Sequence, residues 1–203
     1  EHDLLAAVHE IPGVERIRFA SPHPRHVSQP FLRALRGLTK VCRHLHLPVQ
    51  SGSTRVLSAM RRRYTREQYL DLVGQIRSDL PEFALSTDMI VGFPGETARD
   101  FSETLSLTVE ARYHSMFSFK YSPRPHTAAD KRFADAVSEP EKTARIVELQ
   151  ALQRGIQSDI NASMVGRDVE VLVDGASRRS DHELTGRTSQ NVVVNVPGSS
   201  AWI

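Results

Sequence analysis

The chain has 203 residues, of which 39% are hydrophobic and 25% charged, a balance typical of soluble globular proteins. Cys42 is the one cysteine, which excludes an internal disulfide framework and any zinc or iron–sulfur site built from this chain's thiols alone. No apolar run reaches membrane-spanning length, and we expect a fragment because the chain begins without Met and stops without a closing turn.

Helices and strands alternate along the chain as far as residue 137. Short apolar runs that end at Ser, Pro or Gly indicate the strands, while capping residues followed by a one-sided apolar pattern indicate the helices. In chain order we expect a helix over 3–8, a strand over 17–20, a helix from 28, a strand over 45–50, helices over 53–60 and from 65 to 80, a strand over 84–93, a helix from 97 and a strand over 115–121. This alternation predicts an α/β fold with parallel strands, either a doubly wound sheet or a whole or partial barrel.

The pattern changes after residue 137. Ser138 and Glu141 form a capping box for a long amphipathic helix, whose apolar residues recur from Leu149 to Met164. From Arg167 onward apolar and polar residues alternate with period two, and further short strands are expected over 184–188 and 192–196. We therefore predict a barrel domain over 1–137, a connecting long helix over 138–165 and a small, incomplete all-β module over 166–203.

Positive charge is concentrated in one third of the chain. Residues 16–66 contain twelve Arg or Lys and no Asp or Glu, which leaves 14 basic against 24 acidic residues elsewhere. Nucleic-acid phosphate is the default partner of such a segment. The alternative is a solvated face whose charges pair with carboxylates from the acidic remainder.

Two arginine clusters are candidates for RNA contact. Arg61, Arg62 and Arg63 are the densest, and Tyr64 beside them offers a ring that could stack on a base. An exposed linker with incidental charge is the alternative. In the β module, Arg178, Arg179 and Arg187 form a weaker candidate, because the module from residue 167 holds four basic against five acidic residues.

Ligands of parallel α/β proteins bind outside the carboxyl ends of the strands. Those ends here are polar, glycine-rich and basic, and they lie at 21–23, 50–53, 92–96 and 121–124. Alternation also directs Leu45, Leu47 and Val49 toward covering helices and His44, His46, Ser86, Asp88 and Ile90 to the other face. We expect a lumen that holds a nucleotide or another polar organic cofactor, because a buried Asp needs partners.

A metal site is the alternative at this face. His44 and His46 on one strand, with Asp88 on the next, resemble the ligands of a metal-dependent hydrolase. Two hydrogen-bonded lumen histidines would explain the same pattern. Cys42 has no evident thiolate activator, and we expect a structural thiol.

Six segments together resemble one protein family, the radical-SAM tRNA methylthiotransferases, in the order in which that family has them. They are HLHLPVQSGS (44–53), MRRRYT (60–65), STDMIVGFPGET (86–97), YSPRPHTAA (121–129), SRRSDHELTGRT (177–188) and NVVVNVPG (191–198). The last two resemble the family's TRAM domain, a small RNA-binding β barrel. His126 stands where the family has Gly, which implies a modest loop difference.

The resemblance implies a fold, cofactors and partners. The fold would be the later strands of a partial TIM-like radical-SAM barrel, followed by a long helix and an OB-like TRAM module. The cofactors would be S-adenosylmethionine and two 4Fe–4S clusters in the full-length enzyme, whose cysteine ligands are absent here, so we expect no catalytic residue in this chain and no activity from it alone. The expected partners are tRNA and the missing N-terminal portion of the same enzyme, in a cytoplasmic monomer with no membrane contact.

The implied reaction adds a methylthio group to C2 of isopentenyl-adenosine next to the anticodon. Strand-end position and family similarity together suggest the residues that would contact S-adenosylmethionine, namely Ser21, Gln50, Ser51, Asp88, Ile90, Val91 and Phe119. Alternatives are a non-catalytic RNA-binding fragment, a paralogue acting on threonylcarbamoyl-adenosine, a relative acting on a ribosomal protein and, further away, the metal-dependent hydrolase.

Overall fold

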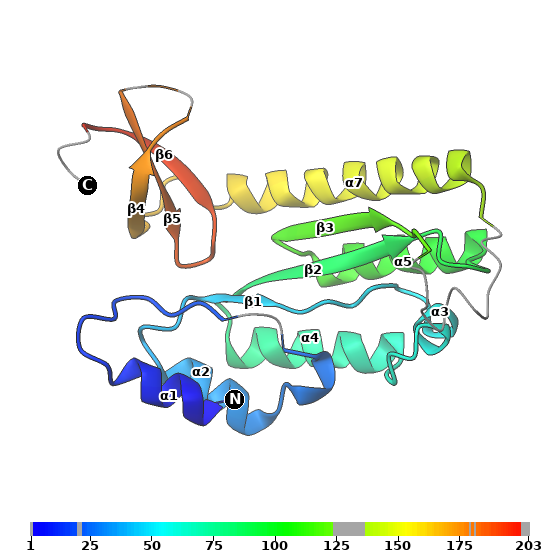
Figure 1. Ribbon diagram of the computed structural model, residues 1–203, viewed down its shortest axis with the longest axis horizontal. Helices are drawn as coiled ribbons and strands as arrows, with labels where there is room; N and C mark the ends of the chain where they lie inside the picture. The colour runs from blue at the N-terminus through cyan, green and yellow to red at the C-terminus, as the bar shows by residue number, and fades with distance from the viewer. Residues whose placement is uncertain (1, 20–21, 124–136, 179, 181, 200–203) are drawn as a thin grey trace.

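A computed structural model describes residues 2–19, 22–123, 137–178, 180 and 182–199. Two sheets form within these ranges, a parallel one of three strands and an antiparallel one of three strands. A long helix, α7 (Glu139–Ala162), runs beside the parallel sheet and leads to the antiparallel module (Figure 1). Among the described helices none combines the length and the apolar character that crossing a lipid bilayer requires.

Within the described residues up to 120, helices and strands alternate as predicted, except around residues 17–20. The elements are α1 (His2–His9), the short 3₁₀ helix η1 (Pro24–His26), α2 (Gln29–Gly37), β1 (His44–His46), α3 (Thr54–Ala59), α4 (Arg66–Asp79), β2 (Ala84–Val91), α5 (Ala98–Ala111) and β3 (Ser115–Lys120). Ser28 and Ser53 cap α2 and α3, and Thr65 and Thr97 begin the capping boxes of α4 and α5. The predicted start of each of these helices is confirmed.

The parallel sheet has the order β1-β2-β3, with His46 opposite Ser86 and Asp88 opposite Phe117. The predicted strand over 45–50 is shorter than expected, because Pro48 has no N–H and Thr87 takes over the pairing. The Thr87 hydroxyl accepts from Val49 N at 3.0 Å and donates to the Leu47 carbonyl at 2.9 Å. The expected strand over 17–20 is wrong in extent, since within its described part Ile17 makes a single bridge to Val41.

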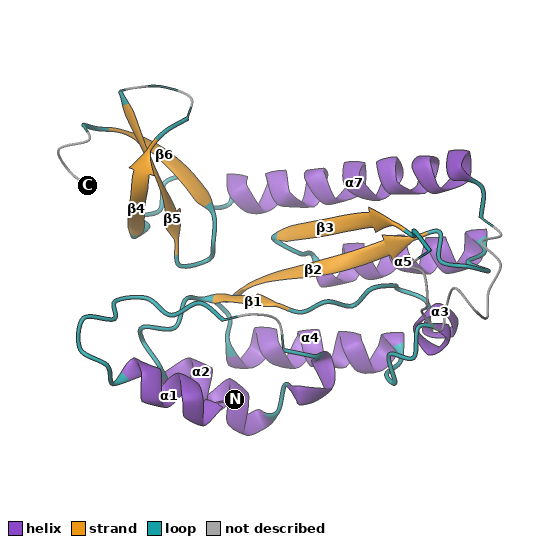
Figure 2. Ribbon diagram, in the orientation of Figure 1, coloured by secondary structure: helices purple, strands orange, loops and turns teal. Residues whose placement is uncertain are grey.

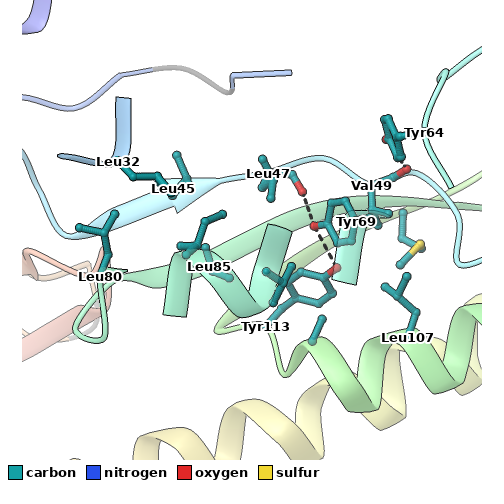
Figure 3. Packing of buried hydrophobic residues seen from close by; sticks show 14 of the residues in the cluster. Leu32, Leu45, Leu47, Val49, Tyr64, Tyr69, Leu80, Leu85, Leu107 and Tyr113 are labelled. Carbon is teal, nitrogen blue, oxygen red and sulfur yellow. Dashed lines mark hydrogen bonds between the residues drawn. The ribbon is translucent and has the colours of Figure 1, made fainter. Parts of the chain in front are cut away.

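Helices cover one face of the sheet, and Figure 2 shows α4, α5 and α7 running alongside the strands. Leu45, Leu47 and Val49 are completely buried on that face, which confirms the prediction from alternation. Two buried tyrosines connect the layers (Figure 3). Tyr113 donates to the Tyr69 hydroxyl at 3.0 Å, and Tyr69 donates to the Leu47 carbonyl at 2.8 Å. Each buried phenol therefore has the partner that its desolvation requires.

The module consists of β4 (Val171–Ala176), β5 (Glu183–Thr188) and β6 (Val193–Pro197), paired antiparallel in that order. It lies at the amino ends of the parallel strands, whose arrowheads point away from it (Figure 1). Arg16 and Arg18 each donate to a carbonyl at the end of β5 at 2.8 Å, and Arg43 N donates to Ser189 Oγ at 2.8 Å. Helix α7 continues through Gly155 without interruption.

Candidate functional site

The face of the parallel sheet opposite the helices carries a row of polar side chains. His44 Nε2 lies 2.9 Å and His46 Nδ1 lies 2.7 Å from the same oxygen, Ser86 Oγ. His46 Nε2 lies 3.3 Å from Asp88 Oδ1, and the His46 and Asp88 side chains are 18% and 29% exposed. The predicted polar face is confirmed, and it is partly open to solvent.

One arrangement of protons satisfies this whole row. A neutral His44 donates from Nε2 to Ser86 Oγ, and the Ser86 hydroxyl donates to His46 Nδ1, which leaves the proton of a neutral His46 on Nε2, 3.3 Å from Asp88 Oδ1. Burial, with the nearby charges of Arg18, His46 and His114, lowers the pKa of His44 to about 4, so it is neutral at physiological pH. The row ends at the Asp88 carboxylate, which lies beside His46 and is partly exposed to solvent.

The turns at the carboxyl ends of β1 and β2 are fixed by close packing and buried charge. A Cβ on Gly52 would lie 2.4 Å from the Thr104 backbone, so only glycine allows this approach to α5. Ser53 donates to Asp100 Oδ1 at 2.6 Å. Burial raises the pKa of Asp100, but hydrogen bonds from Arg55, Ser53 and Thr97 outweigh it and leave the pKa well below its ordinary value.

Arg145 of α7 stabilises the second turn, which follows β2. Glu96 Oε1 accepts from Gly92 N at 2.9 Å and from Arg145 Nη1 at 2.7 Å, and both charged side chains are at least 94% buried. Burial raises the pKa of Glu96 against these hydrogen bonds. Gly92 has φ of +72°, and a Cβ there would lie 2.4 Å from Lys142 Cγ. The backbone of this turn is thereby held at the edge of the open polar face.

Most of the residues that are expected to contact a cofactor lie on this face or at the turns beside it. Gln50 and Ser51 are buried at the turn after β1, where Gln50 bridges to Met89 with φ of +78°. Ile90 is half-buried on the open face and Phe119 is 52% exposed. Val91 is a correction, because it is completely buried against the helices and cannot flank a ligand with its side chain. Ser21 lies outside the described residues.

A groove along the free edge of β3 was not expected from the sequence. It has a volume of about 400 Å³ and is lined by Ser115–Phe119 and by four residues of α7, namely Gln150, Gln153, Arg154 and Gln157. Phe117, which is 59% exposed, has its ring centroid 5.9 Å from that of His46. The spacing of the three glutamines on one helix face was the signal in the sequence that could have indicated this groove.

Half of the twelve basic residues of 16–66 are used within the fold. Those with hydrogen bonds or ion pairs from their side chains are Arg16, Arg18, Lys40, Arg43, Arg55 and Arg66. Glu82, Asp100, Glu110 and Glu170 supply their carboxylate partners. The alternative interpretation, pairing with the acidic remainder, is thus correct for four of these six residues, whereas Arg18 and Lys40 donate to backbone carbonyls. Arg61–Arg63 make no side-chain hydrogen bond or ion pair within the described part of the chain.

Tyr64 is a further correction. Its side chain is buried, its hydroxyl donates to the Val49 carbonyl at 2.9 Å, and burial raises its pKa to about 12. Its ring packs against Tyr69 and His23, with centroids 6.2 Å and 5.7 Å away, so it is not available to stack on a base. The prediction failed because the ring completes the core under the turn that carries Arg61–Arg63.

The two predicted arginine clusters lie far apart. Arg61–Arg63 follow α3 at the carboxyl end of the sheet, whereas the module lies at its amino end (Figure 1). Arg178 is exposed, and Arg187 Nη1 donates to Asn191 Oδ1 at 3.3 Å. Arg179 lies outside the described residues. The clusters therefore do not form one patch.

Two family descriptions match this chain. Residues 1–108 match the description "Radical SAM superfamily", and residues 162–203 match "TRAM domain". The first match covers more than half of the 203 residues. The chain belongs to the radical SAM superfamily.

Relatives of this radical SAM chain carry one printed name, tRNA-2-methylthio-N(6)-dimethylallyladenosine synthase. The protein of Acetivibrio thermocellus is 46% identical over 99% of this chain, and that of Geotalea uraniireducens is 49% identical over 95%. The chain spans 42% and 43% of the length of these two relatives. The resemblance to methylthiotransferases read from the motifs is confirmed.

A solved radical SAM structure confirms the fold class. The coproporphyrinogen III oxidase of Escherichia coli, HemN, aligns with a TM-score of 0.57 over 67% of this chain and 31% of its own length, at 24% identity. Its likeness shows the fold alone. The predicted partial TIM-like barrel followed by a long helix and a small β module is therefore correct.

Membership in the radical SAM superfamily implies S-adenosylmethionine and an iron–sulfur cluster. The described residues do not fit a cluster, because Cys42 is the chain's one cysteine and is buried, and no three His, Cys, Asp or Glu side chains in the described ranges converge on a metal position. They do fit S-adenosylmethionine. The open face combines a carboxylate, Asp88, with apolar Ile90 and Phe119, as a charged nucleoside with an amino-acid group requires.

Proposed function

We propose that this chain is part of a tRNA methylthiotransferase that adds a methylthio group to C2 of isopentenyl-adenosine next to the anticodon. The observation that carries the proposal is the shared name of relatives that are 44% to 49% identical over nearly the whole chain. The match to a TRAM domain supports an RNA substrate. The open polar face at the carboxyl ends of the strands supports a site for S-adenosylmethionine.

S-adenosylmethionine supplies, when bound, the radical and the methyl group of the reaction. We infer that Gln50 and Ser51 hold its ribose and amino-acid groups, since they lie at the turn after β1. Asp88, positioned by His46, accepts hydrogen bonds from the cofactor. Ile90 and Phe119 provide the apolar surface beside its adenine. No catalytic residue is assigned to this chain.

The RNA contacts are assigned to the two predicted arginine clusters. Arg61, Arg62 and Arg63 at the carboxyl end of the sheet would contact phosphates. Arg178, Arg187 and their neighbour Arg179 would do the same in the β module. The proposed division into a barrel domain (1–137), a connecting helix (138–165) and a TRAM-like module (166–203) places one arginine cluster in each of the two outer parts.

The remaining parts of the enzyme are proposed to lie outside this sequence. Two 4Fe–4S clusters would be held by cysteines of an N-terminal portion of the same protein, because Cys42 alone cannot ligate either one. This chain by itself would then be inactive. We propose that the full-length enzyme acts as a monomer in the cytoplasm, where its tRNA substrate is found.

Nucleoside analysis of cellular tRNA tests the function. A strain that lacks the corresponding methylthiotransferase is complemented with the intact gene, and its tRNA is digested and analysed by mass spectrometry. The expected result is the return of methylthio-isopentenyl-adenosine. Return of a methylthio group on threonylcarbamoyl-adenosine would overturn the substrate, and a methylthio group on a ribosomal protein would overturn the RNA assignment. The intact gene carrying Asp88→Asn tests the proposed cofactor site and should restore the nucleoside poorly.

A further inference from the structure

The edge strand β3 presents two large aromatic rings to solvent. Phe117 and Phe119 are 59% and 52% exposed, and they alternate along the strand so that both lie on the open face. Buried aromatics dominate cores, and two exposed neighbours of this size are uncommon unless a partner covers them. Phe117 pairs in register with Asp88, so its ring lies one strand away from the proposed cofactor site.

The β3-edge groove (Ser115–Phe119 with Gln150, Gln153, Arg154 and Gln157) continues this surface around the edge of the sheet. Its lining contains an arginine and three amides and has no carboxylate. Arg154 makes no side-chain hydrogen bond or ion pair among the residues that the structure describes, and it is exposed. The groove is therefore complementary to an anion with hydrogen-bonding edges.

One polar atom of the groove lacks a partner. Gln153 is 7% exposed, and its Nε2 donates to the Tyr113 carbonyl at 2.7 Å. Its Oε1 is buried and accepts no hydrogen bond from any described residue. A buried acceptor without a donor costs about 1–3 kcal/mol in a folded protein, so an N–H group that reached it would be bound favourably.

We propose that the β3-edge groove binds an unpaired nucleotide of the RNA substrate, with its base stacked on Phe117 and its phosphate at Arg154. The inference rests on the proposed function and deepens it by naming where the RNA lies. Glutamine amides hydrogen-bond the edges of bases, and exposed aromatic rings stack on their faces. The elements that line the groove, β3 and α7, run between the module at one end of the sheet and α3, which Arg61–Arg63 follow, at the other (Figure 1).

An extended peptide is the competing occupant, because the free edge of β3 could pair with another strand. The lining favours RNA instead. Peptide pairing would use the backbone of β3 and leave Phe117 uncovered on the open face, whereas a stacked base covers the ring. Stacking also explains the position of the ring beside His46, since the reacting base must come close to the cofactor.

The test uses the intact protein and an anticodon stem–loop RNA with 2-aminopurine at one unpaired loop position. Fluorescence anisotropy at fixed salt gives the Kd, and quenching of 2-aminopurine reports stacking. Phe117→Ala and Arg154→Gln should each raise the Kd by about 10-fold, and Phe117→Ala should also relieve the quenching. Phe117→Trp should restore both. Val147→Ala is the matched control, because Val147 is 56% exposed on α7 and does not line the groove.

The outcomes separate this proposal from the one on which it rests. If the wild-type protein does not bind the RNA, the RNA substrate of the proposed function fails, and the groove assignment falls with it. If wild type binds but Phe117→Ala changes neither Kd nor quenching, only the groove assignment is overturned. Protection from hydrogen exchange of those β3 amides that do not bond to β2, in the RNA-free intact protein, would show a polypeptide strand in the groove and would also overturn it.

Discussion

The buried ion pair between Arg145 and Glu96 offers the sharpest test of how this fold holds its strand-end turn. Arg145 is 6% and Glu96 is 1% exposed at the side chain, and Glu96 in turn holds the Gly92 amide. Replacing Arg145 with Leu keeps much of the buried volume but removes the cation. Glu96 is then left as a buried carboxylate with the backbone N–H of Gly92 as its remaining partner.

The expected loss can be bounded from the two states of Glu96. Removing one partner of a buried pair costs about 3–5 kcal/mol when the other stays charged. Protonation of Glu96 removes this buried charge, and it costs about 1.4 kcal/mol for each pH unit above the ordinary pKa of 4.5. The penalty from the charge therefore cannot exceed about 4 kcal/mol at pH 7.5, or about 1.4 kcal/mol at pH 5.5.

The sign of the pH dependence follows from the raised pKa of Glu96. Burial raises this pKa in the folded state, and loss of Arg145 removes two influences that lower it. The folded variant then binds more protons than its unfolded state, so its stability increases as the pH falls. The deficit of Arg145→Leu relative to wild type should shrink from about 3–4 kcal/mol at pH 7.5 to about 1–2 kcal/mol at pH 5.5.

Urea unfolding followed by circular dichroism measures both values. Arg99→Leu is the matched control, because Arg99 is 89% exposed in its i,i+4 pair with Glu103 and should change the free energy of unfolding by less than about 0.5 kcal/mol. A deficit for Arg145→Leu below about 1 kcal/mol at pH 7.5 would refute the reasoning. A deficit that stays constant between the two pH values would refute the role given to the charge of Glu96.

Four further outcomes are expected. Gly92→Ala should lose about 1–3 kcal/mol in urea unfolding, because its φ is +72° and a Cβ would lie 2.4 Å from a buried side-chain carbon, whereas Gly74→Ala, in an open helical position, should gain about 0.5–1 kcal/mol. The pKa of His44 is lowered to about 4 in the folded state, so the unfolded state binds more protons between about pH 6.5 and pH 4. The free energy of unfolding should therefore fall by roughly 1–2 kcal/mol over this range, and a His44→Asn variant should lose this pH dependence. Gln50→Ala in the intact protein should raise the Kd of S-adenosylmethionine at least about 5-fold by calorimetry; an unchanged Kd removes Gln50 from the site. Replacing arginines 61–63 with Gln should reduce the slope of log K for tRNA against log salt by about 2–3, and an unchanged slope would contradict phosphate contact.

Local sequence patterns predicted most of the helices and strands correctly. Ser53, Thr65 and Thr97 each begin a helix where expected, because a cap is decided by residues three positions apart. Alternation along 44–49 and 84–91 assigned both faces of the sheet correctly, since the period of a strand fixes the face of each side chain. The polar row from His44 to Asp88 followed from these two local rules.

Long-range partners could not be predicted in the same way. Tyr64 follows three arginines in the sequence, but its hydroxyl donates to the carbonyl of Val49. This contact forms only when the chain folds, so the local sequence does not indicate it. Thr87 shortens the pairing of β1 by inserting its hydroxyl between Leu47 and Val49. The β3-edge groove combines residues more than 30 positions apart, and no short window of sequence contains both of its sides.

The net charge of the basic segment, residues 16–66, predicts an RNA-binding surface only in part. Twelve positive residues without a carboxylate suggested one polyanion surface, yet Arg16 and Arg18 fasten the module and Arg66 pairs with Glu110. The arginines that remain available, at 61–63, lie at the opposite end of the sheet from the module. An RNA that touches both ends must cross the length of the sheet, and the β3-edge groove lies along that path. Electrostatic contact at two distant ends would orient the RNA, while stacking at the centre would place one base beside the cofactor site.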